Sequence, residues 1–134
     1  MYEYKDKVMV YDVDYQGVSH YAAYYRYFTD AIESYKEEKL GFTTNNYSDA
    51  VWFVVVESKA DYHESLHLNE EITVGVEAEL KSPKTIKFNL KIFNKDKTLC
   101  TEGYLIMSAI NPKIWKSTEV PKELVDKINE SNKA

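Results

Sequence analysis

One stretch of this sequence has the spacing of a long amphipathic helix. Its apolar residues recur at intervals of three and four positions, which gathers them on one face of a helix; they are Tyr24, Tyr27, Phe28, Ala31, Ile32 and Tyr35. Arg26 is among the charged residues on the opposite side. Ser19 precedes the stretch as the expected N-cap, and Gly41 follows it as a C-terminal stop. The pattern predicts a helix over residues 20–40.

Most of the remaining chain alternates between apolar and polar residues with a period of two, as strands with one buried face do. The predicted strands cover residues 4–13, 51–62, 72–80, 86–92 and 98–110. The turn Lys81–Lys84 joins two of them as a hairpin, and a weaker helical pattern follows Pro121.

These lengths predict an α+β fold, with one long helix packed on a five-stranded antiparallel sheet in a single domain over residues 1–134. A helix of about 20 residues is roughly 30 Å long, and strands of about 9 to 12 residues run for roughly 30–40 Å. One helix therefore covers one face of the sheet. The other face and the edges need more cover than this chain provides, so a homodimer or homotetramer is expected.

The amino-acid composition argues against some classes of binding partner. The 17 basic and 22 acidic residues give a net charge of −5, which argues against nucleic acid and anionic membranes as partners. The single cysteine, Cys100, has no partner for a disulfide within the chain. No apolar run is long enough to span a bilayer, and the first residues lack the layout of a signal peptide. A cytoplasmic location is expected.

The densest group of chemically useful residues lies between Tyr11 and Tyr21, at the end of the first predicted strand and the start of the helix. A helix start offers unpaired N–H groups and a positive dipole end, which stabilise a developing oxyanion. A carboxylate beside it, such as Asp14, can act as a nucleophile or as a base towards water. Asp and Gly before a helix are also ordinary turn residues, which is the structural alternative.

The run Asp14-x-x-Gly17-Val18-x-His20-Tyr21, followed by an aromatic helix, resembles the signature of hot-dog fold acyl-CoA thioesterases. The similarity is greatest to the 4-hydroxybenzoyl-CoA thioesterase-like branch and covers nearly the whole chain. It implies the hot-dog fold and hydrolysis of an acyl-CoA thioester to free acid and CoA, without a metal or another cofactor.

The resemblance also implies roles for individual residues. Asp14 stands where the family has its catalytic carboxylate, acting as nucleophile or general base, and Tyr21 stands where a backbone N–H polarises the thioester carbonyl. Pockets of the family form between subunits, so residues of the second strand, such as Glu57, are expected to face the Asp14 of a partner.

Substrate contacts are expected at five further positions. Gly17 matches the turn glycine of the family, and His20 matches a pocket position, although it could equally cap the helix. Tyr24 is expected on the side of the helix that lines the pocket and the subunit contact. Lys84 and Thr85 occupy the strand turn where the family contacts the CoA phosphates, although solvated lysines are common on hairpins.

Other candidates have plain structural readings. His63 and His67 are four residues apart but lie in a predicted loop, so no metal site is expected. Asp12 either faces Asp14 or is solvated at the strand edge, and Glu57 is either a second acid or an outward-facing strand residue. The alternative function is a non-catalytic acyl-thioester-binding module or a dimeric scaffold. Thioesters of an acidic carrier protein are disfavoured as substrates by the charge of −5.

Overall fold

The computed structural model describes residues 1–43 and 48–133. In chain order, the elements are β1 (Tyr2–Lys7), a 3₁₀ turn (Val10–Asp12), α1 (Ala23–Tyr35), a π turn (Lys36–Leu40), β2 (Trp52–Tyr62), β3 (Glu71–Ser82), β4 (Thr85–Asn94), β5 (Leu99–Asn111), β6 (Lys116–Ser117) and α2 (Lys122–Ser131). No helix within the described ranges is long and apolar enough to cross a membrane.

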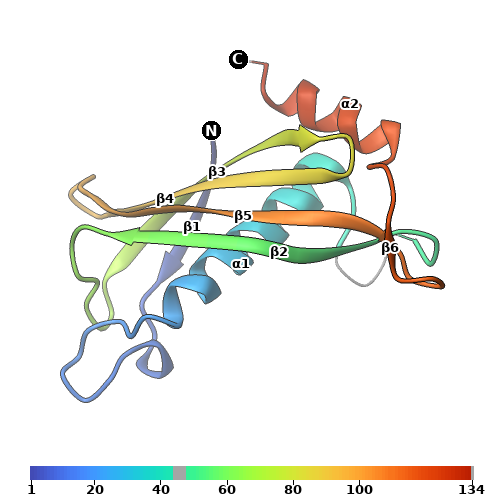
Figure 1. Ribbon diagram of the computed structural model, residues 1–134. Helices are drawn as coiled ribbons and strands as arrows, with labels where there is room; N and C mark the ends of the chain where they lie inside the picture. Colours follow the sequence, from blue (N-terminus) through green and yellow to red (C-terminus); the bar gives the residue numbers. More distant parts are fainter. Residues whose placement is uncertain (44–47, 134) are drawn as a thin grey trace.

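The strands form one antiparallel sheet in the order β1-β3-β4-β5-β2, and the two-residue strand β6 pairs with β5. The sheet curls, and α1 lies across its concave face (Figure 1). The predicted hairpin is confirmed, because Ser82 pairs with Thr85 across the turn between β3 and β4. The outermost strands are β1 on one side and β2 on the other.

The apolar stripe of α1 forms the centre of the core, as its spacing predicts. All six of its side chains are buried, and the ring of Tyr35 packs edge-on against Phe88 of β4. The alternating apolar residues of β3 and β4 supply the other side of the core, which includes Ile72, Val74, Val76, Ala78, Ile86, Leu90 and Ile92. Burying each large side chain contributes about 1.5–3 kcal/mol, so this layer fixes the helix on the sheet.

The helix begins later than predicted, at Ala23, and Ser19 is not its N-cap. The residue at the cap position is Ala22, which makes no side-chain cap hydrogen bond. Ser19 is instead bridged to Val13 and takes part in strand-like pairing, which holds it outside the helix. The predicted end is confirmed, because Gly41 has the left-handed φ of 80° that closes a helix.

The first strand is shorter than predicted and ends at Lys7 instead of residue 13. The chain leaves the sheet in a 3₁₀ turn, where the N–H of Met9 donates to the carboxylate of Asp12 at 2.8 Å. This local hydrogen bond competes with continued strand pairing. It turns the segment that follows towards the start of α1.

Two smaller elements accompany the predicted five strands and long helix: a short strand that was not predicted, and a terminal helix that the sequence indicated weakly. The strand β6 is too short to leave a periodic signal, and α2 corresponds to the weak helical pattern after Pro121. Leu124 and Ile128 of α2 are buried, and Lys127 donates to the carbonyl of Leu40 at 3.1 Å. The second helix therefore covers the C-terminal end of α1.

Candidate active site

The segment between β1 and α1 folds back on itself as a small hairpin, which we call the Asp14 loop (residues 12–20). Val13 and Ser19 form an isolated antiparallel bridge. The N–H of His20 donates to the carbonyl of Asp12 at 3.0 Å, and the N–H of Asp14 donates to the carbonyl of Val18 at 3.2 Å. These contacts close the base of the loop and bring the residues before its tip beside those after it.

Asp14 is exposed near the tip of this loop. Its Oδ1 accepts the N–H of Gln16 at 2.9 Å, and its carbonyl accepts the N–H of Gly17 at 3.0 Å. Its other carboxylate oxygen accepts no hydrogen bond from the residues that the structure describes. Gly17 has a φ of +80°, a conformation that glycine adopts without strain. The turn thus holds one carboxylate oxygen and leaves the second free.

The loop ends at the start of α1, where Tyr21 and Ala22 form a turn before the first helical residue. The N–H of Ala23 donates to the carbonyl of His20 at 3.0 Å and to its ring Nδ1 at 3.2 Å. The ring of His20 therefore caps the helix, which is the structural alternative for this residue. Within the described ranges, no acceptor takes the backbone N–H of Tyr21. That N–H lies at the positive end of the helix dipole.

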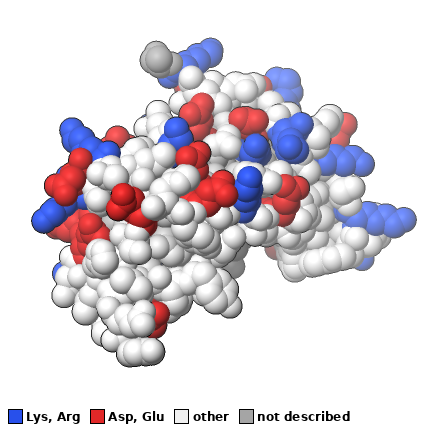
Figure 2. Space-filling model, turned by 60° about the vertical axis from the view of Figure 1, so that its left-hand side comes forward, with Lys and Arg blue, Asp and Glu red and all other residues white. Residues whose placement is uncertain are grey.

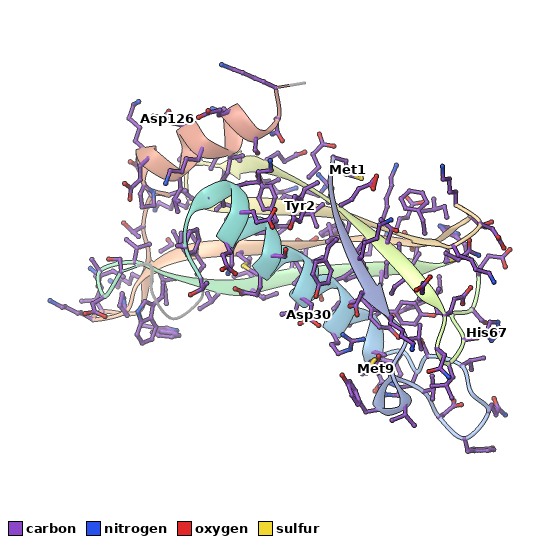
Figure 3. The ribbon with its side chains drawn as sticks, turned by 180° about the vertical axis from the view of Figure 1, so that it is seen from behind. Met1, Tyr2, Met9, Asp30, His67 and Asp126 are labelled. Carbon is purple, nitrogen blue, oxygen red and sulfur yellow. The ribbon has the colours of Figure 1, made fainter. Side chains whose placement is uncertain are left out.

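A second loop holds the Asp14 loop from the side. The N–H of Ser19 donates to the carbonyl of Leu66 at 2.8 Å, and the N–H of Leu68 donates to the carbonyl of Gly17 at 3.0 Å. Val18 and His67 form a bridge between these contacts, and Figure 3 shows His67 in the loop beside this segment. The Asp14 loop is thus paired with the chain that leads into β3.

Arg26 of α1 holds the base of the Asp14 loop. Its Nε and Nη2 donate to the two carboxylate oxygens of Asp12 at 2.7 and 2.5 Å. Its Nη1 donates to Asp6 at 3.2 Å and to Asp30 at 2.8 Å, and its Nη2 also donates to the carbonyl of Lys7 at 3.1 Å. The guanidinium lies 4.7 Å from the centre of the Tyr27 ring.

Asp12 is buried in this contact, with 2% of its surface exposed. Burial alone raises the pKa of its carboxyl, but the hydrogen bonds from Arg26 and Met9 outweigh it and hold that pKa below its usual value. Both expectations for Asp12 were wrong: its side chain points to Arg26 and is neither solvated nor aimed at Asp14. Arg26 was missed as well, because its charge indicated a solvent-facing position on the helix.

An uncharged, aromatic surface surrounds this site. Tyr11, Tyr15 and Tyr21 are exposed by 64, 96 and 78%. The lowest part of the molecule, which is the segment between β1 and α1 in Figure 1, carries few charged side chains in Figure 2, whereas acidic and basic groups mix above it. The exposed surface around the loop is therefore largely aromatic.

Comparison with known proteins identifies the family. The model of the thioesterase-like superfamily matches residues 8–128, which is most of the chain. The protein belongs to the thioesterase-like superfamily. Its predicted family resemblance is thereby confirmed, and the matched range includes the Asp14 loop, α1 and the strands β2 to β5.

Relatives and solved structures agree with this assignment. A protein of Aquifex aeolicus that is provisionally named an esterase is 26% identical over 124 residues, which are 92% of this chain and 94% of that protein. The 1,4-dihydroxy-2-naphthoyl-CoA thioesterase from Synechocystis is 16% identical and superposes with a TM-score of 0.91 over 98% of both chains. A hypothetical protein of Staphylococcus aureus, solved in complex with CoA, is 19% identical with a TM-score of 0.86 over 96% of this chain and 81% of that one. The hot-dog architecture of curled sheet and central helix is thus confirmed.

In this thioesterase-like chain, Tyr24 lies in the core. It is 5% exposed, and its ring packs edge-on against Tyr62 at 4.7 Å and against Tyr27 at 5.8 Å. Burial raises the pKa of its hydroxyl. The helix tyrosines thus serve mainly to build the core, and contact between Tyr24 and substrate stays a prediction.

Lys84 and Thr85 lie far from Asp14 in the thioesterase-like fold. They occupy the β3–β4 turn, where the hydroxyls of Ser82 and Thr85 are 2.7 Å apart and the N–H of Lys84 donates to Ser82. The strand β3 has 12 residues, so its two ends are about 35 Å apart. In Figure 1 the turn and the segment between β1 and α1 lie at opposite ends of the molecule. One chain does not bring these residues together.

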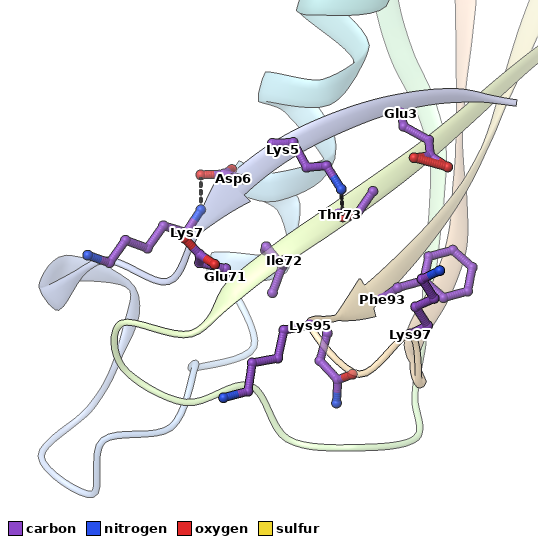
Figure 4. A pocket seen from close by; sticks show the side chains of 11 residues that line it. Glu3, Lys5, Asp6, Lys7, Glu71, Ile72, Thr73, Phe93, Lys95 and Lys97 are labelled. Carbon is purple, nitrogen blue, oxygen red and sulfur yellow. Dashed lines mark hydrogen bonds between the residues drawn. The ribbon is translucent and has the colours of Figure 1, made fainter.

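A pocket of about 850 Å³ opens on the outer face of the sheet near β1 and the β4–β5 turn (Figure 4). None of its lining residues belongs to the Asp14 loop. Its charges nearly cancel, because four lysines face three carboxylates; the charged residues are Lys5, Lys7, Lys95, Lys97, Glu3, Asp6 and Glu71. We therefore assign the candidate site to the Asp14 loop and not to this pocket.

The two histidines that lie four residues apart in the sequence make separate contacts. The ring of His63 bonds Glu102 at 3.1 Å, whereas the backbone N–H of His67 bonds Glu70. Among the described residues, no three His, Cys, Asp or Glu side chains gather in a way that would hold a metal ion. Cys100 is buried, and burial raises the pKa of its thiol, so it is a core residue.

Proposed function

We propose that this protein is an acyl-CoA thioesterase that hydrolyses an acyl-CoA thioester to the free acid and CoA. One observation carries the proposal: the Asp14 loop has a free carboxylate oxygen near its tip and ends at the free N–H of Tyr21, at the start of α1. A carboxylate beside an oxyanion donor is what thioester hydrolysis requires of a protein. Family membership supports the same reaction.

Two mechanisms use these groups. In the first, the Asp14 carboxylate attacks the thioester carbonyl carbon, the C–S bond breaks, CoA leaves as the thiolate, and water then hydrolyses the mixed anhydride. In the second, Asp14 takes a proton from water as the oxygen attacks the carbonyl carbon, the C–S bond of the tetrahedral intermediate then breaks, and CoA leaves as the thiol with the proton that Asp14 returns. In both, the N–H of Tyr21 donates to the carbonyl oxygen as negative charge develops on it.

We further propose that two copies of the chain pair through β2 to complete the site. β2 is an edge strand of 11 residues, and among the residues that the structure describes it pairs with β5 alone. Val55 and Val56 are exposed by 53 and 58%, and the pairing with β5 shifts between Val55 and Glu57. A long, apolar, unpaired edge is ordinarily covered in a stable protein. Glu57 accepts the hydroxyl of Tyr104, so we keep it as an outward-facing strand residue.

This pairing would bring the distant turn to the Asp14 loop. The Tyr62 end of β2 lies at the first turn of α1, since Tyr62 packs on Tyr24. The opposite end lies by the β3–β4 turn, because Thr85 pairs with Ser108 and Ser108 pairs with Val54. An antiparallel pairing of β2 with its copy about a two-fold axis therefore sets the Asp14 loop of one protomer near Lys84 and Thr85 of the other.

The acyl group is proposed to be apolar, with aromatic acids included. Exposed tyrosines surround Asp14, and the relative from Synechocystis is named for a bicyclic aromatic acyl group. Aromatic rings stack favourably against tyrosine.

The test measures the release of free thiol from a panel of acyl-CoAs with short, long and aromatic acyl groups. Wild type is compared with Asp14→Asn, because asparagine keeps the acceptor for the Gln16 N–H and removes only the charge. Asp126→Asn is the matched control, since Asp126 is an exposed carboxylate on α2. Only multiple turnovers count, because Cys100 supplies at most one thiol per chain.

We expect turnover that falls at least a hundredfold in Asp14→Asn and is unchanged in Asp126→Asn. Turnover that does not depend on Asp14 would assign catalysis to another residue. No turnover on any acyl-CoA would favour the non-catalytic acyl-thioester-binding module or, if thiol is released from acylated carrier protein, a carrier-protein substrate.

A further inference from the structure

We infer that Arg26 is a positioning residue, which acts through Asp12 to hold Asp14 and the N–H of Tyr21 in register. This inference rests on the proposed function. Its starting point is that Asp12 occupies a branch point: it precedes Asp14 by two residues, and its carbonyl accepts the N–H of His20, which immediately precedes Tyr21. The positions of both proposed reactive groups therefore depend on Asp12, one through two residues of backbone and the other through a hydrogen bond.

The side chain of Asp12 is fixed from three directions. Both of its carboxylate oxygens accept N–H groups of the Arg26 guanidinium, and one also accepts the N–H of Met9. A bidentate pair of this kind sets orientation as well as distance, which the single ammonium of a lysine does not. Since the carboxylate is buried, no competing position in water is open to it.

Arg26 is itself fixed by elements outside the loop. It belongs to the first turn of α1, donates to Asp6 of β1 and to the carbonyl of Lys7 where that strand ends, and bonds Asp30 one turn along the helix. Figure 3 shows Met9 beside the start of α1 and Asp30 further along the same helix. The guanidinium thus joins the helix, the sheet edge and the base of the Asp14 loop at one point.

Because Asp14 stands on one arm of the hairpin and Tyr21 directly follows the other, their separation depends on how firmly the base is closed. A misplacement of about 1 Å costs roughly a hundredfold in rate. The loop tip is exposed and carries glycine, and among the described residues the neighbouring loop pairs with only the returning arm of the hairpin, at residues 17–19, so the position of the Asp14 arm depends on the base. Loss of the Arg26 contact should therefore reduce kcat and leave KM largely unchanged.

The experiment compares Arg26→Gln, Asp12→Asn and the double variant in acyl-CoA hydrolysis. We expect kcat to fall at least tenfold in each single variant, with KM within twofold of wild type. The kcat of the double variant should be no lower than that of the more impaired single variant, because both changes break the same contact. Arg26→Lys should recover part of kcat. Asp126→Asn, which removes an exposed carboxylate of α2 that pairs with Lys122, should retain kcat within twofold.

A second control separates positioning from general destabilisation. Tyr35→Phe loses the hydrogen bond between Tyr35 and Ser131 at the far end of α1, so it should lower the melting temperature without changing kcat. A parallel fall of kcat and melting temperature across all variants, with Tyr35→Phe included, would overturn the inference.

Amide hydrogen exchange supplies a readout that needs no activity. In wild type the N–H of His20 is bonded to Asp12, and we expect its exchange to quicken at least tenfold in Arg26→Gln while amides in the middle of α1, such as that of Ala31, keep their rates. Unchanged exchange at His20 would overturn the inference. If wild type hydrolyses no acyl-CoA, the proposed function fails, and the exchange result still decides whether Arg26 anchors the loop.

Discussion

The hydroxyl oxygens of Ser19 and Tyr27 lie 2.7 Å apart, which joins the Asp14 loop to the side of the helix that follows it. Tyr27 is fully buried below the loop. The pair is a second anchor, independent of Arg26, on the returning arm of the hairpin. It also explains why Ser19 is unavailable as a helix cap.

Removing this anchor should cost little stability but loosen the loop. Tyr27→Phe keeps the ring and deletes the hydroxyl, so we expect the free energy of unfolding to fall by about 1 kcal/mol, measured by urea denaturation. Ser19→Ala is the matched change on the other partner and should cost a similar amount. A double variant with the summed cost of both would contradict a direct interaction.

The same tyrosine makes stability depend on alkaline pH. Burial raises the pKa of Tyr27 to about 12. A raised folded pKa gives stability that is complete below the unfolded value of about 10 and is lost as pH rises towards 12, because the unfolded chain releases its proton first. The stability difference between wild type and Tyr27→Phe should therefore shrink over this window. A constant difference from pH 9 to 12 would contradict the assignment.

The pair between Asp12 and Arg26 predicts the opposite dependence at acid pH. The pKa of Asp12 lies below its usual value of 3.8, so its contribution is complete above that pH and is lost as pH falls through the folded pKa. At neutral pH we expect Asp12→Asn to lower the free energy of unfolding by about 3 kcal/mol, as for a broken buried ion pair. The difference in the free energy of unfolding between wild type and Asp12→Asn should become smaller below pH 4. A difference that grows below pH 4 would show that Asp12 is protonated in the folded protein.

If β2 pairs with its copy, a charged residue introduced among its exposed valines should separate the subunits. Val56→Asp introduces a carboxylate at the bulge of this edge strand, and we expect the mass in solution to fall to that of one chain and turnover to fall at least tenfold. Val10→Asp is the control, because Val10 is also exposed, by 72%, but lies outside the strand. A wild-type protein that is already monomeric at micromolar concentration would contradict pairing through β2.

A buried hydroxyl in β5 predicts a stabilising change. Thr101 is fully buried, and within the described part of the chain its Oγ1 has no hydrogen-bond partner. Thr101→Val keeps the shape and removes the unsatisfied oxygen, so we expect the free energy of unfolding to rise by about 1 kcal/mol. Ser108→Ala is the contrast, because Ser108 is buried but donates to a carbonyl at 3.2 Å. It should leave stability unchanged or lower it.

Periodicity was sufficient to predict the core of this fold. The stripe on α1, the hairpin at Ser82 and Thr85 and the terminal helix are all local patterns, and in each the residues that decide the structure lie within a few positions of one another. The family signature likewise led to the Asp14 loop, because its spacing is fixed by a strand end and a helix start.

The contacts that hold the loop could not be predicted in this way. Asp12 and Arg26 are 14 residues apart, and a charged residue opposite an apolar stripe normally faces water. Only the 3₁₀ turn at Asp12, which ends the strand early, turns that carboxylate inward. The pairing of Ser19 with Leu66 joins parts of the chain 47 positions apart and leaves no local pattern.

The irregularity between Val55 and Glu57 has a consequence for misfolding. A flat, apolar edge strand is a template for aggregation, because it can recruit any extended polypeptide into a growing ladder. The bulge gives β2 an extra residue that interrupts a regular ladder and increases the local twist. It therefore favours a partner whose own strand carries the same interruption, and fibril-like stacking of mismatched chains is discouraged by the backbone itself.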